Sequence, residues 1–191
     1  HDISRGRVPS LETLKWVVDY LAAHKANMYQ LYVEHPFMFR FNPDIAHNPD
    51  GLTPEEILEL DKYCHARRVK FVPSLQSFGH MGGVLSLPEY RDLAAVPLEK
   101  RWEEMTWDDR MHGATINPTD PDAQELLAKM WDAYMPLFTA DFANASADET
   151  WDLGEGQTEE AAEEMGVGRL YLKHIKYLNS LANRYDKRLM M

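Results

Sequence analysis

Apolar residues along this chain follow two spacings, one typical of helices and one typical of buried strands. Leu11, Leu14, Val18 and Leu21 recur three or four positions apart, which predicts a helix over residues 10–24 with a single apolar face. The same spacing predicts further helices over residues 53–67, from Asp120 to Tyr134, and over residues 158–185 with an interruption near Gly166 to Gly168.

Short apolar runs rich in β-branched and aromatic residues separate these helices and predict strands. The strands are expected at residues 27–33, 69–75 and 142–147, with a brief one at 114–117 and partial ones at 2–4 and 187–191. Strands that alternate with helices at this spacing indicate βα units around a parallel sheet. The stretch from Met81 to Gly113 is irregular apart from a short helix expected at residues 88–95. Because it is too long for a simple connection, it predicts an excursion over an active-site face.

Polar and reactive side chains follow the predicted strands at their carboxyl ends. They are Arg5, Glu34 with His35, the run from Gln76 to His80, and Asp148 with Glu149. This pattern predicts an α/β fold in the form of a partial (β/α)8 TIM barrel, roughly strands 1 to 5, because barrel enzymes gather catalytic groups there. A doubly wound open sheet is the alternative, although no Gly-x-Gly-x-x-Gly follows a strand. Because both ends fall within predicted strands, residues 1–191 are expected to form an incomplete catalytic domain that continues beyond both ends in the parent chain.

Charge and composition narrow the classes of partner. The net charge of -11 argues against binding to nucleic acid and against docking on anionic membranes. No apolar run approaches the roughly 20 residues that a membrane span requires. The single cysteine, Cys64, excludes an intrachain disulfide and lies on the apolar side of a predicted helix. Since the start lacks a secretory signal, a cytoplasmic location is expected, and secretion stays open because a removed signal would leave no trace.

The run from Phe142 to Gly156 carries the main chemical signal. It reads as a strand of small residues that leads into the neighbouring acids Asp148 and Glu149. Beyond the last paired strand residue the backbone can turn, so both carboxylates can reach one pocket from different angles. Such a pair suits chemistry in which one carboxyl carries a proton and the other stabilises a positive charge. The alternative interpretation is a solvated acidic turn.

Other polar and aromatic residues allow competing interpretations. A metal site could draw on Glu34, His35, His80 and Asp148, but no His-Glu-x-x-His or His-x-His spacing supports one. No Gly-x-Ser-x-Gly marks a nucleophilic serine. Three tryptophans are interpreted as core residues more readily than as sugar platforms: Trp102, Trp107 and Trp151.

Three segments share their residues with a known family. They are Asp2-Ile-Ser-Arg5, Val72-Pro-Ser-Leu-Gln-Ser-Phe-Gly-His80 and Ala147-Asp-Glu-Thr-Trp-Asp-Leu-Gly-Glu-Gly156. Together they resemble glycoside hydrolase family 20, the β-N-acetylhexosaminidases, and within it the hexosaminidase D-like branch. The resemblance extends over nearly the whole chain, and it implies the barrel fold that the strand ends also predict.

The resemblance implies retaining, substrate-assisted hydrolysis of terminal β-linked N-acetylhexosamine residues from glycans or glycoconjugates. Glu149 would be the general acid and base, and Asp148 would hold the acetamido group whose carbonyl oxygen attacks the sugar. Substrate-binding roles are expected for Arg5, Glu34, Gln76, His80, Asn117 and Trp151. The expected partner is a carbohydrate with a terminal N-acetylhexosamine, and neither a metal nor an organic cofactor is expected.

Two alternatives stay open beside this hypothesis. One is a non-catalytic carbohydrate-binding barrel, and the other is a metal-dependent sugar hydrolase or deacetylase.

The implied roles set electrostatic requirements. Glu149 must hold a proton near neutral pH, so we expect it to be buried beside its anionic neighbour. Asp148 must stay ionised, so we expect it to accept more hydrogen bonds than Glu149. The segment before His80 departs from the Pro-Glu-x-Asp-x-Pro-Gly-His pattern of many family members. Ser74, Gln76 and Phe78 replace the Glu, the Asp and the second Pro, which leaves His80 without the expected aspartate partner.

Overall fold

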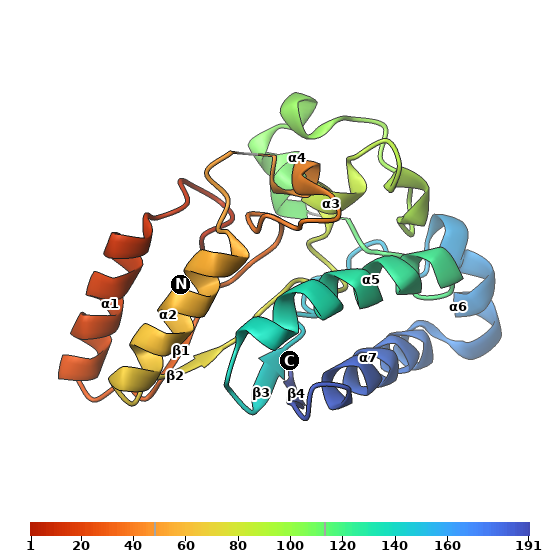
Figure 1. Ribbon diagram of the computed structural model, residues 1–191. Coiled ribbons are helices and arrows are strands. Elements are labelled where there is room, and N and C mark those ends of the chain that lie inside the picture. Colours follow the sequence, from red (N-terminus) through yellow and green to blue (C-terminus); the bar gives the residue numbers. More distant parts are fainter. Residues whose placement is uncertain (48, 113) are drawn as a thin grey trace.

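The computed structural model describes residues 1–47, 49–112 and 114–191, and helices and strands alternate along them (Figure 1). In chain order they are α1 (Leu11–Ala23), β1 (Met28–Gln30), α2 (Pro54–Ala66), β2 (Lys70–Val72), α3 (Gly82–Leu85), α4 (Trp107–His112), α5 (Pro121–Tyr134), β3 (Phe142–Asn144), α6 (Glu159–Met165), α7 (Val167–Asn183) and β4 (Arg188–Met190). The predicted α/β class is confirmed. Gly113, which closes the predicted excursion, lies outside the described residues.

The strands run parallel and neighbour one another in chain order. β1 pairs with β2, and β3 pairs with β4. Single parallel bridges extend this order, joining Asp2 to Tyr32, Val33 to Leu75 and Ser74 to Asn144. The named strands are shorter than predicted because ladder pairing gives way to these single bridges. Five extended segments therefore lie in parallel, and their carboxyl ends meet at one edge.

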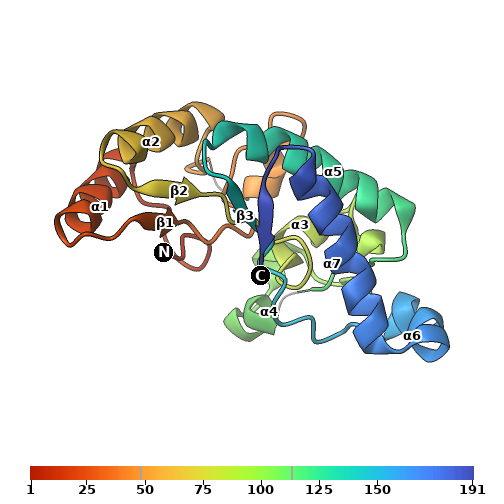
Figure 2. The same cartoon turned by 90° about the horizontal axis from the view of Figure 1, so that it is seen from below.

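The helices lie along the strands and bury their apolar faces. α1 packs on α2, α2 on β2, and α7 on β4, an arrangement visible from below in Figure 2. Leu14 and Val18 of α1 and Leu60 and Cys64 of α2 have no exposed surface, which confirms the faces predicted from spacing. The first turn of α2 has a capping box, in which the Thr53 and Glu56 side chains satisfy each other's backbone N–H groups.

The prediction for the excursion after His80 is wrong in detail. Instead of a helix over residues 88–95, the chain forms the short helices α3 and α4 and only a 3-10 turn at Arg91–Leu93. The helix stops there because the Ala95 N–H bonds to the Thr115 carbonyl oxygen (2.7 Å) and the Asn117 N–H to the Leu93 carbonyl oxygen (2.7 Å). Residues 114–117 likewise make single bridges and no continuous strand.

None of the helices in the described part of the chain combines the length and the hydropathy needed to cross a bilayer.

Candidate active site

The backbone turns sharply just beyond β3, where Asp148 and Glu149 lie. Ala145 and Ala147 before them are buried, whereas the side chains of Asp148 and Glu149 are 55% and 48% exposed. Ser146 and Glu149 both have left-handed backbone angles, with φ of 48° and 51°, which is uncommon for residues other than glycine. This turn points two neighbouring carboxylates toward the same histidine.

His80 joins the two carboxylates. Its Nε2 atom lies 2.9 Å from Glu149 Oε2 and 3.9 Å from Asp148 Oδ2. The ring is almost fully buried, and its Nδ1 atom has no hydrogen-bond partner among the described residues. Glu149 therefore orients the His80 ring and takes the place of the aspartate that the family pattern would supply.

Gly79 allows this arrangement because it has no side chain. A Cβ atom at this position would lie 2.0 Å from the Asp148 carbonyl oxygen and 3.1 Å from that of Glu149. The two neighbouring segments therefore touch backbone to backbone, one following β2 and the other following β3. Any side chain at position 79 would push the carboxylate pair away from His80.

The buried side chain of Gln76 holds Asp148 in place by a hydrogen bond. Its Nε2 donates to Asp148 Oδ1 (2.9 Å) and to the Tyr32 hydroxyl (2.6 Å). Because Gln76 has no exposed surface, the structure places it as a support for Asp148 and not on a surface that substrate can reach. Tyr32 was not singled out from the sequence, where it reads only as an aromatic strand residue.

Arg5 and Glu34 lie at the neighbouring strand ends. Arg5 donates to Asp2 Oδ2 at 2.8 Å, and its other terminal nitrogen lies 2.8 Å from Glu34 Oε1 and 3.4 Å from the Tyr32 hydroxyl. The contact with Glu34 is an ion pair by distance but lacks hydrogen-bond alignment. Burial therefore outweighs the attraction of Arg5 and raises the pKa of Glu34 from 4.5 to about 7. A polar chain thus runs from Arg5 through Tyr32 and Gln76 to Asp148.

Asn117 is buried, whereas two of the three tryptophans are exposed. The Asn117 side-chain oxygen accepts the N–H and hydroxyl of Thr119, so this buried residue closes a local turn before α5. Trp151 and Trp107 are 65% and 61% exposed, which contradicts a core position for either. Trp102 is partly buried and stacks on His47.

Two electrostatic expectations are not met by the described residues. Glu149 is not buried, because it lies beyond the strand end where no described segment covers it. Asp148 does not make more hydrogen bonds than Glu149 among the described residues, because Asp148 is bonded to Gln76 and Glu149 to His80. Glu149 instead lies beside the buried imidazole of His80.

Only part of the alternative metal set comes together. His80 and Asp148 lie together with Glu149, and one potential ligand atom from each falls within 4.8 Å of the others. His35 instead packs against Trp102, with ring centroids 4.6 Å apart. Burial lowers the pKa of His35 to about 3, so this ring stays neutral.

Comparison with known sequences gives a consistent result. A family model described as the catalytic domain of glycosyl hydrolase family 20 matches residues 2–190. The chain is 25% identical over 158 residues to hexosaminidase D of Bos taurus, covering 81% of this chain and 41% of that protein. It is 23% identical over 183 residues to hexosaminidase D of Homo sapiens, covering 92% of this chain and 34% of that protein. The chain therefore spans between about a third and two-fifths of the length of these relatives.

Solved structures share the fold. A chitobiase from Flavobacterium johnsoniae superposes with a TM-score of 0.80 at 21% identity, over 100% of this chain and 30% of that one. An exo-β-N-acetylglucosaminidase from Vibrio harveyi, solved with N-acetylglucosamine, gives a TM-score of 0.69 at 15% identity. This match covers 98% of this chain and 34% of that one. At these identities the likeness establishes the fold and leaves the chemistry to be argued from the site.

The contact at Gly79 leads to a stability prediction. In the Gly79→Ala variant, the clash with the Asp148 carbonyl forces the backbone to shift, so we expect a loss of roughly 2–4 kcal/mol in unfolding free energy. Urea unfolding measures it. The matched control is Gly168→Ala in α7, where a Cβ meets nothing within 4 Å and the change is expected to be neutral or stabilising. Equal stability of the two variants would contradict the backbone contact.

Burial of Glu34 leads to a pH prediction. Its pKa is higher in the folded state than its ordinary 4.5, so the folded protein holds this proton more tightly and loses stability as pH rises from 4.5 to about 7. Glu34→Gln removes this dependence, so the variant should gain on the order of 2 kcal/mol over wild type near pH 8 and little near pH 5.

Denaturant unfolding at both pH values checks this expectation. Glu12→Gln, at a side chain that is 83% exposed, serves as the control and should show no such pH dependence. If Glu34→Gln and wild type differ in unfolding free energy by the same amount at both pH values, the raised pKa of Glu34 is contradicted.

Proposed function

The chain belongs to glycosyl hydrolase family 20, and we propose that it supplies the catalytic carboxylates of a retaining β-N-acetylhexosaminidase. The observation that carries this proposal is the convergence of Asp148 and Glu149 on His80 at the carboxyl edge of parallel strands. The proposed substrates are glycans or glycoconjugates that end in a β-linked N-acetylhexosamine. Names of relatives, such as chitobiase and hexosaminidase D, support this substrate class.

The strand order supports a partial (β/α)8 barrel. Five parallel segments neighbour one another in chain order, with helices between them, as in the first five units of such a barrel. In that fold the catalytic groups lie at the carboxyl ends of the strands. Arg5, Glu34, His80, Asp148 and Glu149 all follow strand or bridge residues in this way.

In the first step, Glu149 would donate its proton to the glycosidic oxygen while the bond from that oxygen to the anomeric carbon breaks. The carbonyl oxygen of the substrate's own acetamido group would attack the anomeric carbon and form a cyclic oxazolinium ion. Asp148 would accept the acetamido N–H and stabilise the positive charge. The nucleophile is already part of the substrate, so its effective concentration is high.

In the second step, a water molecule would attack the anomeric carbon and reopen the ring. Glu149, now a carboxylate, would take a proton from this water, which returns the enzyme to its starting state. Two inversions give net retention of configuration. His80, at 2.9 Å from Glu149, would orient the carboxyl in both steps.

The surrounding residues would divide between support and substrate contact. Gln76 and Tyr32 hold Asp148 and have supporting roles. The guanidinium of Arg5 would bind sugar hydroxyls while Asp2 and Glu34 fix its orientation. A hollow of about 320 Å³ beside Asp148, lined by Tyr32, Asn144, Ser146 and Tyr171 among others, has a suitable position for the acetamido group.

A metal-dependent sugar hydrolase or deacetylase is the second candidate. It is favoured by the spacing of His80, Asp148 and Glu149, whose ligand atoms lie within 4.8 Å of one another. Activity that persists after dialysis against a chelator would support the substrate-assisted route, whereas loss and recovery with a divalent ion would support this candidate.

We expect Glu149→Gln to lose activity by a factor that depends on the leaving group. With a methyl N-acetylhexosaminide, the loss in kcat should be roughly a thousandfold or more, because the amide cannot supply a proton. With a nitrophenyl glycoside, whose leaving group needs little protonation, the loss should be smaller. Steady-state kinetics on both substrates measure this, and Glu164→Gln on the exposed side of α6 is the control. Equal losses on both substrates would contradict a role as general acid.

We expect Asp148→Asn to weaken stabilisation of the charged intermediate. The loss in kcat should be roughly 100-fold to 1000-fold, the size typical of one lost electrostatic partner. A thiazoline mimic of the intermediate should also bind more weakly, while affinity for the plain sugar changes less. Inhibition constants for the two compounds measure this, and unchanged thiazoline affinity would rule out the proposed contact.

A further inference from the structure

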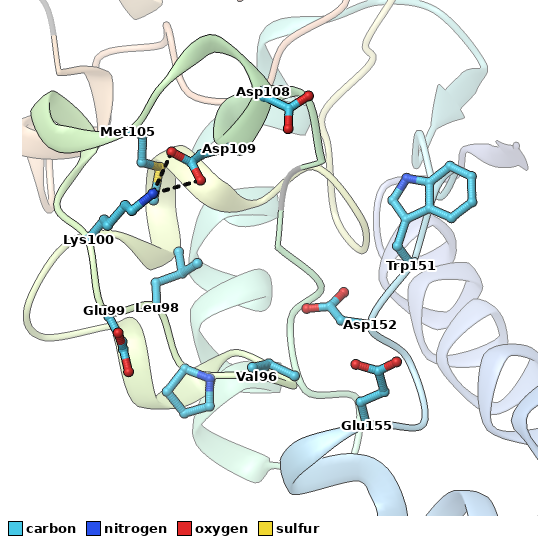
Figure 3. A pocket seen from close by; sticks show the side chains of 11 residues that line it. Val96, Leu98, Glu99, Lys100, Met105, Asp108, Asp109, Trp151, Asp152 and Glu155 are labelled. Atoms are coloured by element: carbon cyan, nitrogen blue, oxygen red, sulfur yellow. Dashed lines mark hydrogen bonds and ion pairs between the residues drawn. The ribbon is translucent and has the colours of Figure 1, made fainter.

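A second hollow lies between the excursion after His80 and the loop after Glu149 (Figure 3). Its volume is about 380 Å³. Trp151 borders it, and the backbone N–H of Trp151 donates to the Glu149 carbonyl oxygen at 3.0 Å. The hollow therefore begins two residues from the proposed acid.

The walls of this hollow are fixed by contacts between the two segments. The Gln157 side chain donates to the carbonyl oxygens of Asp92 and Ala94, and its backbone N–H donates to that of Ala95. Asp152 accepts the N–H of Thr115 at 3.1 Å as well as its hydroxyl. A Cβ at Gly156 would lie 2.6 Å from the Ala95 carbonyl oxygen, so the segments meet backbone to backbone.

The lining combines an aromatic surface with apolar side chains. Trp151 is 65% exposed, although it lies in a segment held by several hydrogen bonds. Val96, Leu98 and Met105 add apolar surface across the hollow (Figure 3). An indole exposed beside a cavity is suited to contact the C–H face of a sugar ring while leaving the ring hydroxyls in water.

The charge of the lining is strongly negative. Among the described residues of the lining, Lys100 is the one cation, and it faces the carboxylates of Glu99, Asp109, Asp152 and Glu155. Lys100 is already paired with Asp109, through contacts of 2.9 Å and 2.8 Å. The resulting field attracts a positively charged group and repels a carboxylate or a sulfate.

We propose that this hollow is the aglycone subsite of the proposed hydrolase and that it favours a sugar with a free, protonated amino group. This inference rests on the proposed function. The leaving group departs on the side of Glu149, and Trp151 lies two residues beyond it in the same segment, whereas Arg5 is tied through Tyr32 and Gln76 to Asp148. The preferred substrate class is therefore a terminal N-acetylhexosamine linked to an amino sugar, as in partly deacetylated oligosaccharides.

The test compares three substrates that share the terminal sugar and differ in the aglycone. They are the β-1,4 disaccharide of N-acetylglucosamine on glucosamine, the same disaccharide fully N-acetylated, and methyl N-acetylglucosaminide. The values of kcat/KM are measured at a pH where the amine is protonated and at ionic strengths of about 20 mM and about 500 mM. We expect the glucosamine aglycone to be favoured several-fold over its acetylated counterpart at low salt, and this preference to shrink at high salt.

Two variants and their matched controls separate stacking from charge. Trp151→Ala should lower the ratio of disaccharide to methyl glycoside activity roughly tenfold, equal to about 1.4 kcal/mol. Trp16→Ala, at an equally exposed tryptophan on α1, should leave the ratio unchanged. Glu155→Gln should reduce the preference for the glucosamine aglycone, whereas Glu164→Gln on α6 should not. Thiazoline binding verifies that each variant has a folded site.

The outcomes distinguish this inference from the proposed function. If none of the substrates is hydrolysed and thiazoline does not bind, both proposals fail. If hydrolysis occurs but Trp151→Ala leaves the ratio of activities unchanged, only the aglycone subsite is overturned. A preference for the acetylated aglycone that does not respond to salt or to Glu155→Gln would overturn the charge selectivity.

Discussion

The backbone contact between Gly79 and Asp148 is the constraint on which the rest of the site depends. It brings the segment after β2 within touching distance of the segment after β3, where a side chain would not fit. His80, the next residue, then reaches Glu149 at 2.9 Å across 69 positions of sequence. Without this close approach the acids would follow their strand as ordinary exposed carboxylates, which was the alternative interpretation of the same residues.

Support for the site extends outward from this contact in two directions. Toward the first strands, Gln76 and Tyr32 connect Asp148 to Arg5, so groups from four segments share one polar chain. Toward the later chain, the loop after Glu149 is fastened to the excursion by Gln157 and Gly156. The two carboxylates therefore lie between two fixed walls although about half of each side chain is exposed. An open but rigid arrangement of this kind suits a group that must meet a substrate without reorganising.

Local patterns in the sequence predicted much of the fold. Helical spacing identified the buried faces of α1 and α2, and the alternation of strands with helices predicted parallel pairing. The excursion was predicted as an irregular segment, but its helices were misplaced because backbone bonds from Ala95 and Asn117 to distant partners end the expected helix. Such contacts between distant residues leave no periodic signal.

The candidate site was predictable in its centre and less so in its surroundings. Asp148 and Glu149 stood out because they follow a strand, and His80 because it follows a glycine in the neighbouring strand turn. The burial of Gln76 and the part played by Tyr32 could not be read from the sequence, since both depend on which strands become neighbours. Exposure of Trp151 was missed for a similar reason, because a tryptophan near a strand is usually buried.

In the proposed mechanism the substrate's own acetamido oxygen is the nucleophile, held by Asp148 while Glu149 moves the proton. The most direct measurement is kcat/KM for a series of aryl glycosides whose N-acyl group carries none, one, two or three fluorine atoms. Fluorine withdraws electrons from the carbonyl oxygen, so the rate should fall at each step and by at least roughly a hundredfold across the series. A rate that does not depend on fluorination would contradict the account, because it would place the nucleophile elsewhere.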